Sequence, residues 1–189
     1  MKSYKIKIER DENAWDPRED DNFTTMVCFH KRYNLGDKHN VNGDEYASWG
    51  EMEEAIKADE EVMIMKPLYM YEHSGITIST SPFSCNFDSG RLGLVYITKA
   101  SLMKMCSRTD FTEEELNAML ESEVKTYDMY VQGEVYSYSI YEVVTCSLGH
   151  EHEELLDDCG GYYGEEEARE EAEAIVKVYE EQTAVAYHS

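Results

Sequence analysis

The stretch from 111 to 133 constrains the fold of this chain most, because it carries an unusually complete helix signature. Thr112 and Glu115 have the spacing of a capping box, in which each side chain accepts a hydrogen bond from the other residue's backbone N–H. Phe111 and Leu116 have the spacing of the hydrophobic staple that accompanies such a box. Apolar residues continue at helical spacing, and Gly133 follows where a left-handed stop is favoured. The pattern predicts an amphipathic helix that another element must cover.

Three further helices are predicted from similar signals. Ser48 and Glu51 form a second capping box, followed by an apolar face that indicates a short helix. Another short helix is expected over 99–106. The last helix is predicted over about 164–182, where alanine and aliphatic residues recur on one side and glutamates occupy the rest. The short helix over 99–106 is the least distinct, so about three main helices are expected.

The other apolar stretches are short and rich in β-branched and aromatic residues, which is typical of strands. They are 4–9, 23–30, 62–71, 76–80, 92–98 and 135–145. Pro67 indicates an edge or a break within the third of them, because proline has no N–H for a ladder. Residues 146–161 show no apolar alternation and are predicted to form an acidic loop. Strands interleaved with hairpins and helices predict an α+β fold with a mainly antiparallel sheet, in a single domain over 1–189.

Charge limits the partners that this chain can have. It has 17 Lys and Arg residues against 40 Asp and Glu residues, which gives a net charge of −23. Phosphate backbones and anionic membrane surfaces would repel such a chain, so neither direct nucleic-acid binding nor membrane binding is expected. The acids are uneven: residues 1–50 are nearly balanced, whereas 151–189 hold 13 acids and two bases. A basic protein surface is the partner that this distribution favours.

Cysteine usage and the chain start indicate an intracellular protein. Five cysteines without framework spacing favour reduced thiols. The first twelve residues, MKSYKIKIERDE, lack the apolar core of a secretion signal. No apolar run approaches the roughly 18–20 residues that span a bilayer. A cytoplasmic location is therefore expected, while the oligomeric state stays open.

Three blocks of the sequence resemble a known family. They are AWDPREDDNFTTMVCFHKRYNLGDKH (14–39), PLYMYEHSGITISTSPFSCNFDSGRLGLVYITK (67–99) and VKTYDMYVQGEVYSYSI (124–140). Together they are similar to a family of acidic proteins of uncharacterised function that phages and other mobile elements encode, common in gut bacteria. The resemblance extends from Trp15 to about Tyr163. It implies a non-structural accessory protein that acts in the host cytoplasm against host defences, and it transfers no catalytic residue.

The predicted terminal helix is the leading candidate for partner binding. Its glutamates far outnumber its two cations, Arg169 and Lys177. Acids three or four residues apart on a helix lie about 5–6 Å from each other, a spacing loosely like that of successive phosphates. An ordinary solvated face would mix both signs. The residues expected to contact the partner are Glu165, Glu166, Glu170, Glu173 and Glu181.

Two loops are candidates for a metal. Cys146, His150, His152 and Cys159 are the types of ligand that zinc prefers, although their spacing is not a standard finger pattern. The acids between Asp11 and Asp21 are hard oxygen donors that suit calcium, but they lack the regular spacing of a calcium loop. A metal-binding protein or small metal-dependent enzyme is therefore the alternative function. The simplest expectation remains that no cofactor is bound.

Two cysteines have neighbours that suit a thiol nucleophile. Cys28 and His30 point to the same face of a strand, and Cys85 has His73 and Asp88 nearby in sequence. A small buried thiol explains such a cysteine as well. No Walker-type loop, Gly-x-Ser-x-Gly or dinucleotide motif is present. Catalysis is accordingly not expected.

The sequence as a whole predicts a non-enzymatic inhibitor of a host nucleic-acid-acting defence, of the anti-CRISPR or antirestriction type. The acidic C-terminal half would occupy the basic groove of a host nuclease as a DNA mimic. A phage accessory protein of other function, whose charge only keeps it soluble, is the further alternative.

Overall fold

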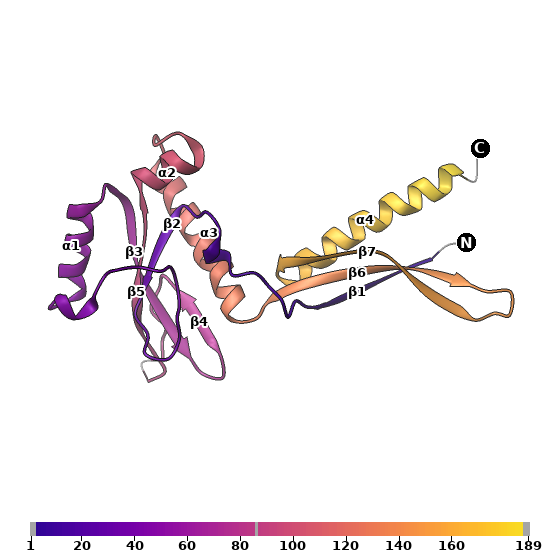
Figure 1. Cartoon of the computed structure of the whole chain (residues 1–189), viewed down its shortest axis with the longest axis horizontal. Coiled ribbons are helices and arrows are strands. Elements are labelled where there is room, and N and C mark those ends of the chain that lie inside the picture. The colour runs from indigo at the N-terminus through magenta and orange to yellow at the C-terminus, as the bar shows by residue number, and fades with distance from the viewer. Residues whose placement is uncertain (1–2, 86, 187–189) are drawn as a thin grey trace. The chain divides into compact units, whose positions relative to one another are not determined.

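A computed structural model describes residues 3–85 and 87–186, with the side chains of 183–186 left out of the description. The chain divides into two compact units, shown in Figure 1. Unit 1 consists of Met1–Trp15 and Gly133–Ser189, and unit 2 consists of Asp16–Gln132. The strands are β1 (Ser3–Arg10), β2 (Thr24–Cys28), β3 (Val62–Glu72), β4 (Ile76–Ser79), β5 (Ser89–Thr98), β6 (Val135–Thr145) and β7 (Glu151–Tyr163). The helices are α1 (Trp49–Asp59), α2 (Lys99–Cys106), α3 (Glu113–Val131) and α4 (Glu165–Ala186).

Unit 2 is a four-stranded antiparallel sheet covered on both faces. Its strand order is β2-β5-β3-β4. On one face α1 inserts Met52 and Ile56 beside Leu94 of β5. On the other face α3 packs Leu120 and α2 packs Leu102, in a cluster with β2, β3 and β5. Figure 1 shows α1 and α3 on opposite sides of the sheet. Because helices cover both faces of the sheet, every residue of β5 from Leu92 to Thr98 is buried.

Unit 1 is a three-stranded antiparallel sheet with one helix on it. β6 lies between β1 and β7. Ile6 pairs with Ile140, and Ile8 pairs with Tyr138, which places four apolar side chains on one face. α4 covers this face with Ala172, because a small side chain lets the helix approach the sheet closely.

The α+β class with antiparallel strands is confirmed. The strands form two separate sheets, whereas the sequence led us to expect one. Four helices are present among the described residues, α2 being the short one. The single domain expected over 1–189 stays a prediction, since compactness does not determine whether the two units unfold together.

The predicted loop over 146–161 is wrong for most of its length. Residues 151–163 form β7, which pairs antiparallel with β6 from Thr145↔Glu151 to Val135↔Tyr163. The acidic sequence has no strand pattern of its own. It becomes a strand because β6 offers a full row of backbone partners, which a local pattern does not reveal. The hairpin turn itself is closed by the N–H of Cys146 donating to the carbonyl of His150.

Pro67 lies at a local edge of the sheet, as its chemistry requires. It pairs with Leu94 of β5 on one side. On the other side β4 pairs only with Tyr69–Glu72 of β3. The edge predicted at Pro67 is therefore confirmed, although β3 itself continues through it.

No helix in the described part of the chain combines the length and the apolar character needed to cross a bilayer. The five cysteines, all within the described ranges, form no disulfide.

Candidate functional site

The terminal helix carries the predicted partner-binding residues on its solvent side. Ala168 and Ala172 are fully buried against the sheet, and Ile175 and Val176 pack beside them. The helical repeat turns the intervening positions outward. The five glutamates predicted to contact a partner are all exposed: Glu165, Glu166, Glu170, Glu173 and Glu181. The helix start expected at about 164 agrees with α4, whereas α4 continues to Ala186, beyond the expected end at about 182.

The negative charge of α4 is little compensated within the described residues. Arg169 donates to Glu165 at 2.7 Å, one helical turn away. The other cation of the helix, Lys177, is exposed. Since Glu165 is the one member of the predicted set that engages Arg169, it is also the least available to a partner.

β7 adds acidic residues from the segment that is predicted to form a loop. Five of them lie along this strand, and only Asp157 is partly buried: Glu151, Glu153, Glu154, Asp157 and Asp158. Lys5 of β1 forms an ion pair with Glu153 at 2.6 Å. β7 is an edge of its sheet, and charged side chains also discourage pairing of such an edge with other chains. We define the acidic surface as these five residues together with the exposed glutamates of α4.

The four zinc candidates are not brought together. His152 pairs with Val144 near the hairpin tip, whereas Cys159 pairs with Tyr138 in the middle of the sheet. The two residues are seven positions apart on one strand, which is about 23 Å at the usual rise of a strand. One ion cannot bind both, so the four-ligand set is wrong as a single site. Among the described residues no three Cys, His, Asp or Glu side chains gather with metal-binding geometry.

The acidic run that is a candidate for calcium contributes several carboxylates to the structure of the chain. Asp16 caps a short 3-10 turn, Pro17–Glu19, by accepting from the N–H of Arg18 at 2.9 Å. Asp21 forms an exposed ion pair with Lys104. Asp11 belongs to unit 1, where it accepts from the N–H of Gly161 at 3.1 Å. In the part of the chain that the structure describes, none of these carboxylates belongs to a group of three or more side chains that could hold a metal ion.

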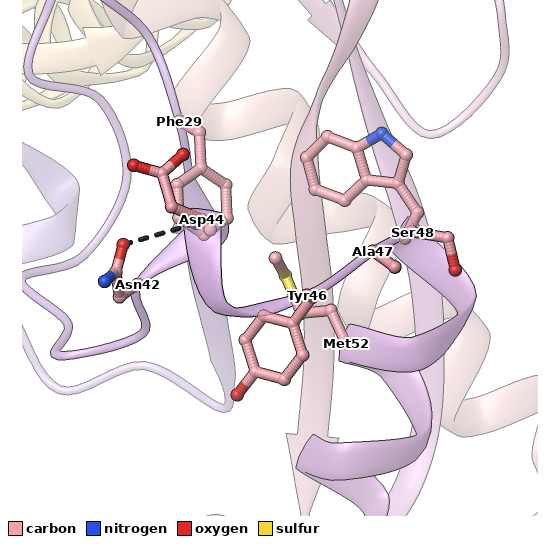
Figure 2. Close-up of a pocket in the computed structure, with 9 residues that line it drawn as sticks. Phe29, Asn42, Asp44, Tyr46, Ala47, Ser48 and Met52 are labelled. Atoms are coloured by element: carbon pink, nitrogen blue, oxygen red, sulfur yellow. Dashed lines mark hydrogen bonds between the residues drawn. The ribbon is translucent and has the colours of Figure 1, made fainter.

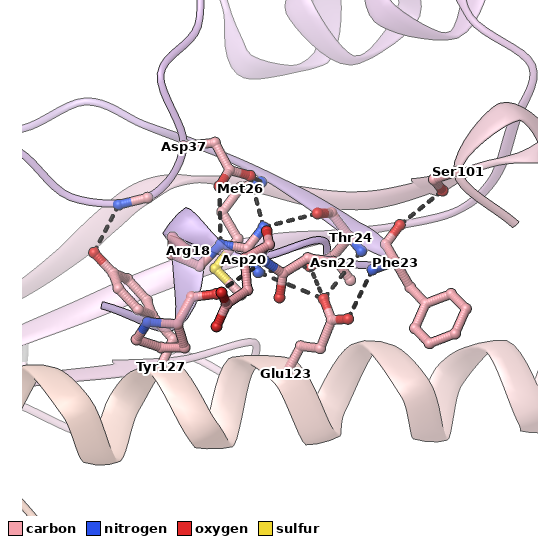
Figure 3. Close-up of polar contacts among 12 residues, drawn as sticks. Arg18, Asp20, Asn22, Phe23, Thr24, Met26, Asp37, Ser101, Glu123 and Tyr127 are labelled. Atoms are coloured by element: carbon pink, nitrogen blue, oxygen red, sulfur yellow. Dashed lines mark hydrogen bonds and ion pairs between the residues drawn. The ribbon is translucent and has the colours of Figure 1, made fainter. Parts of the chain in front are cut away.

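Arg18 is the centre of the polar network that organises this region (Figure 3). Its guanidinium binds Asp37 with two parallel hydrogen bonds of 2.9 and 2.6 Å. It also donates to the carbonyl of Thr24 at 2.7 Å and lies 3.4 Å from a carboxylate oxygen of Glu123. A bidentate arginine of this kind fixes both distance and orientation.

The two carboxylates of the network also hold backbone groups. Glu123 of α3 accepts from the N–H groups of Phe23 and Thr24, at 2.8 and 3.0 Å. Asp37 accepts from the N–H of Met26 at 2.7 Å. The network thus fixes the start of β2 to α3 and to the following loop. Its role in the described structure is to stabilise unit 2.

Neither thiol candidate has the geometry of a nucleophile. Burial raises the pKa of Cys28 to about 12, so its thiol stays protonated at neutral pH. The Nδ1 atom of His30 accepts from the N–H groups of Arg32 and Tyr33 at 3.3 and 3.2 Å, and is therefore occupied by its own loop.

Cys85, His73 and Asp88 do meet, but in the wrong order. One carboxylate oxygen of Asp88 lies 3.9 Å from the sulfur of Cys85 and 3.4 Å from Nδ1 of His73. A thiol nucleophile needs the imidazole beside the sulfur and the carboxylate behind the imidazole. Here the carboxylate contacts both groups and occupies the middle position, which is not the order of a thiol nucleophile and its base.

A cavity of about 500 Å³ in unit 2 was not predicted from the sequence (Figure 2). It is lined by Phe29, Asn42, Gly43, Asp44, Tyr46, Ala47, Ser48, Trp49 and Met52. The lining residues come from the end of β2, the following loop and the start of α1. This loop has no alternating pattern and no motif in the sequence, and its aromatic residue before the Ser48 cap, Tyr46, is the one signal that points to it.

Comparisons of this chain with protein-family models, with curated proteins and with solved structures find no match.

Proposed function

We propose that this protein is a non-enzymatic binding protein of a phage or other mobile element, and that its acidic surface occupies the basic groove of a host nucleic-acid-acting defence enzyme. The observation that carries the proposal is the concentration of charge in one part of one unit. Residues 151–189 hold 13 acids and two bases, and one of those bases is already paired with Glu165. A partner rich in Lys and Arg would supply the missing counter-charges.

The repulsion among the glutamates of α4 supports a role in binding. Like charges three or four residues apart destabilise a helix by about 0.2–0.5 kcal/mol per pair. Glu166 and Glu170, and Glu170 and Glu173, have this spacing on the exposed side of α4. Solubility alone requires a net charge, but it does not require that about half of that charge lie in the last 39 residues.

Strand and helix also suit the recognition of a groove. The acids of β7 are spaced along an extended backbone, and those of α4 follow a helix in contact with it. Positive grooves of nucleic-acid-binding proteins are built to track a line of phosphates. Electrostatic attraction of this kind accelerates association and is screened beyond about 8 Å at physiological ionic strength.

The test is a charge-reversal variant with a matched control. In the test variant Glu166, Glu170, Glu173 and Glu181 become Lys. In the control variant four exposed acids of unit 2 become Lys: Asp20, Glu54, Asp59 and Glu61. Both variants change the net charge equally. The immobilised proteins are exposed to host lysate at low salt, and captured proteins are assayed for DNA binding with and without added free protein.

We expect the wild type and the control to capture the same DNA-binding protein, to displace DNA from it, and to release it as salt rises. The test variant should capture none, while its circular dichroism stays that of the wild type. If the test variant displaces DNA as well as the control does, the acidic surface is not the binding site.

A further inference from the structure

The cavity beside α1 has walls that are held in place by contacts among the residues that form them. Its volume of about 500 Å³ lies within the range of small-molecule sites, roughly 300–1,000 Å³. Phe29 is held by Trp49, with ring centroids 5.8 Å apart, and by His39 at 5.1 Å. A Cβ atom at Gly43 would lie only 3.3 Å from the ring of Phe29, so the glycine lets the loop close against that wall.

Three aromatic rings and a thioether make this lining favourable for a cation. Phe29, Tyr46 and Trp49 contribute rings, and Met52 contributes a polarisable sulfur. Figure 2 shows the rings of Phe29 and Tyr46 and the side chain of Met52 at the cavity. Aromatic faces attract cations through their quadrupole, and tryptophan does so most strongly. Trp49 already has a cation stacked on it, since the guanidinium of Arg91 lies 4.7 Å from its centroid.

The charge of the cavity lining also favours a cationic ligand. Asp44 is the acidic residue of the lining, and it is exposed on the loop. Its backbone N–H donates to the side chain of Asn42 at 3.3 Å, which anchors the turn that carries the carboxylate. A bound anion would face this carboxylate and a net charge of −23 without any cationic group in the lining.

We propose that this cavity binds an organic cation with an apolar body, such as a quaternary or alkylated ammonium group. A metal ion does not fit the lining, because a hard cation requires several oxygen ligands and the cavity offers one carboxylate. An ammonium bearing alkyl groups uses both the aromatic walls and Asp44. Free small molecules and alkylated lysine side chains of a protein present this same group.

The experiment measures binding by the fluorescence of Trp49 in a Trp15→Phe background. These are the two tryptophans of the chain, and Trp15 is exposed outside the cavity. The first probe is choline, and its control is 3,3-dimethylbutan-1-ol, the neutral molecule of the same shape. The second probe is a short peptide containing trimethyllysine, with the unmodified lysine peptide as its control. Isothermal titration calorimetry confirms each result without relying on the fluorophore.

We expect a cationic probe to bind about 10-fold more tightly than its neutral or unmodified control, the factor expected for a partly desolvated cation–aromatic contact. Asp44→Asn should weaken binding by several-fold. Asp59→Asn, an equal change of charge at an exposed position outside the lining, should leave binding unchanged. Tighter binding of choline identifies a free ligand as the source, and tighter binding of the peptide identifies a protein side chain.

The proposal is wrong if the neutral isostere binds as tightly as choline, or if neither cationic probe binds at millimolar concentration. It is also wrong if Asp44→Asn and Asp59→Asn behave alike. Because the cavity lies in unit 2 and the acidic surface lies in unit 1, failure here leaves the proposed partner binding untouched.

Discussion

Replacing Arg18 by Met should remove a largely buried ion-pair network from unit 2. The side chain of Arg18 is only 3% exposed, and those of its partners Asp37 and Glu123 are 20% and 19% exposed. Met keeps the length and apolar contacts of the arginine stem but supplies no charge and no donor. The variant therefore leaves two largely buried carboxylates without the cation that they share.

The expected loss in free energy of unfolding is about 3–5 kcal/mol, the usual cost of removing one partner from a buried ion pair. The lower part of this range fits better, because water still reaches about a fifth of each carboxylate. Domains of this size are typically stable by about 5–15 kcal/mol, so the variant should still fold. With a urea m-value near 2 kcal/mol/M, the midpoint should fall by about 2 M.

The assay is urea unfolding followed by Trp49 fluorescence in the Trp15→Phe background, because Trp49 lies in unit 2. Arg18→Lys keeps the charge but loses the bidentate contact, so it should lose roughly half as much stability. The double variant Arg18→Met/Asp37→Asn should recover part of the loss, since an amide oxygen can still accept from the N–H of Met26. A loss below about 1 kcal/mol for Arg18→Met would refute the reasoning, because the network would then behave as an exposed one.

Three further predictions follow from single sites. Gly93→Ala should destabilise unit 2 by about 3 kcal/mol in the same assay, because its Cβ would lie 1.9 Å from the carbonyl oxygen of Val27. Cys28 should resist iodoacetamide at neutral pH while the exposed thiols react, since burial raises its pKa to about 12; peptide mass spectrometry measures this. Burial pushes the pKa of Glu121 upward, but the ammonium of Lys66 and a threonine hydroxyl outweigh it and hold that pKa below the ordinary value. The contribution of ionised Glu121 to the free energy of unfolding is therefore present above the unfolded-state pKa of about 4.3 and is lost as pH falls through the lower folded-state pKa. We expect Glu121→Gln to reduce the melting temperature at neutral pH and to reduce it less in acid.

Capping residues and helical spacing in the sequence were sufficient to predict the positions of the helices. Thr112 and Glu115 form the reciprocal capping box that their spacing predicts, and α3 begins directly after it. Gly133 follows α3 with a φ of +70°, the left-handed conformation expected of a stop. At α1 the prediction is half right: Ser48 accepts from the N–H of Glu51, but the carboxylate of Glu51 accepts from the N–H of Ala47. Caps are predictable because all their partners lie within four residues.

The candidate sites depended on contacts that the sequence does not encode locally. The acidic surface was predicted on α4 because helical spacing sorts its residues into a buried and an exposed side. Its β7 half was missed, because an acidic segment becomes a strand only when β6 supplies the backbone partners. The predicted zinc site is wrong for the same reason. Pairing with β6 makes this segment an extended strand, so the candidate ligands lie far apart along it.

The sequence by itself therefore determined the helices and their caps, most of the strands, the antiparallel α+β class and the charge of the chain. Each of these follows from residues close together in the chain or from composition. Only the tertiary structure decided the division into two sheets, the burial of Arg18 between Asp37 and Glu123, and the cavity walled by Phe29 and Trp49. The contacts of Arg18 join residues 19 and 105 positions apart, and the free energy of such contacts exists only once the chain has folded.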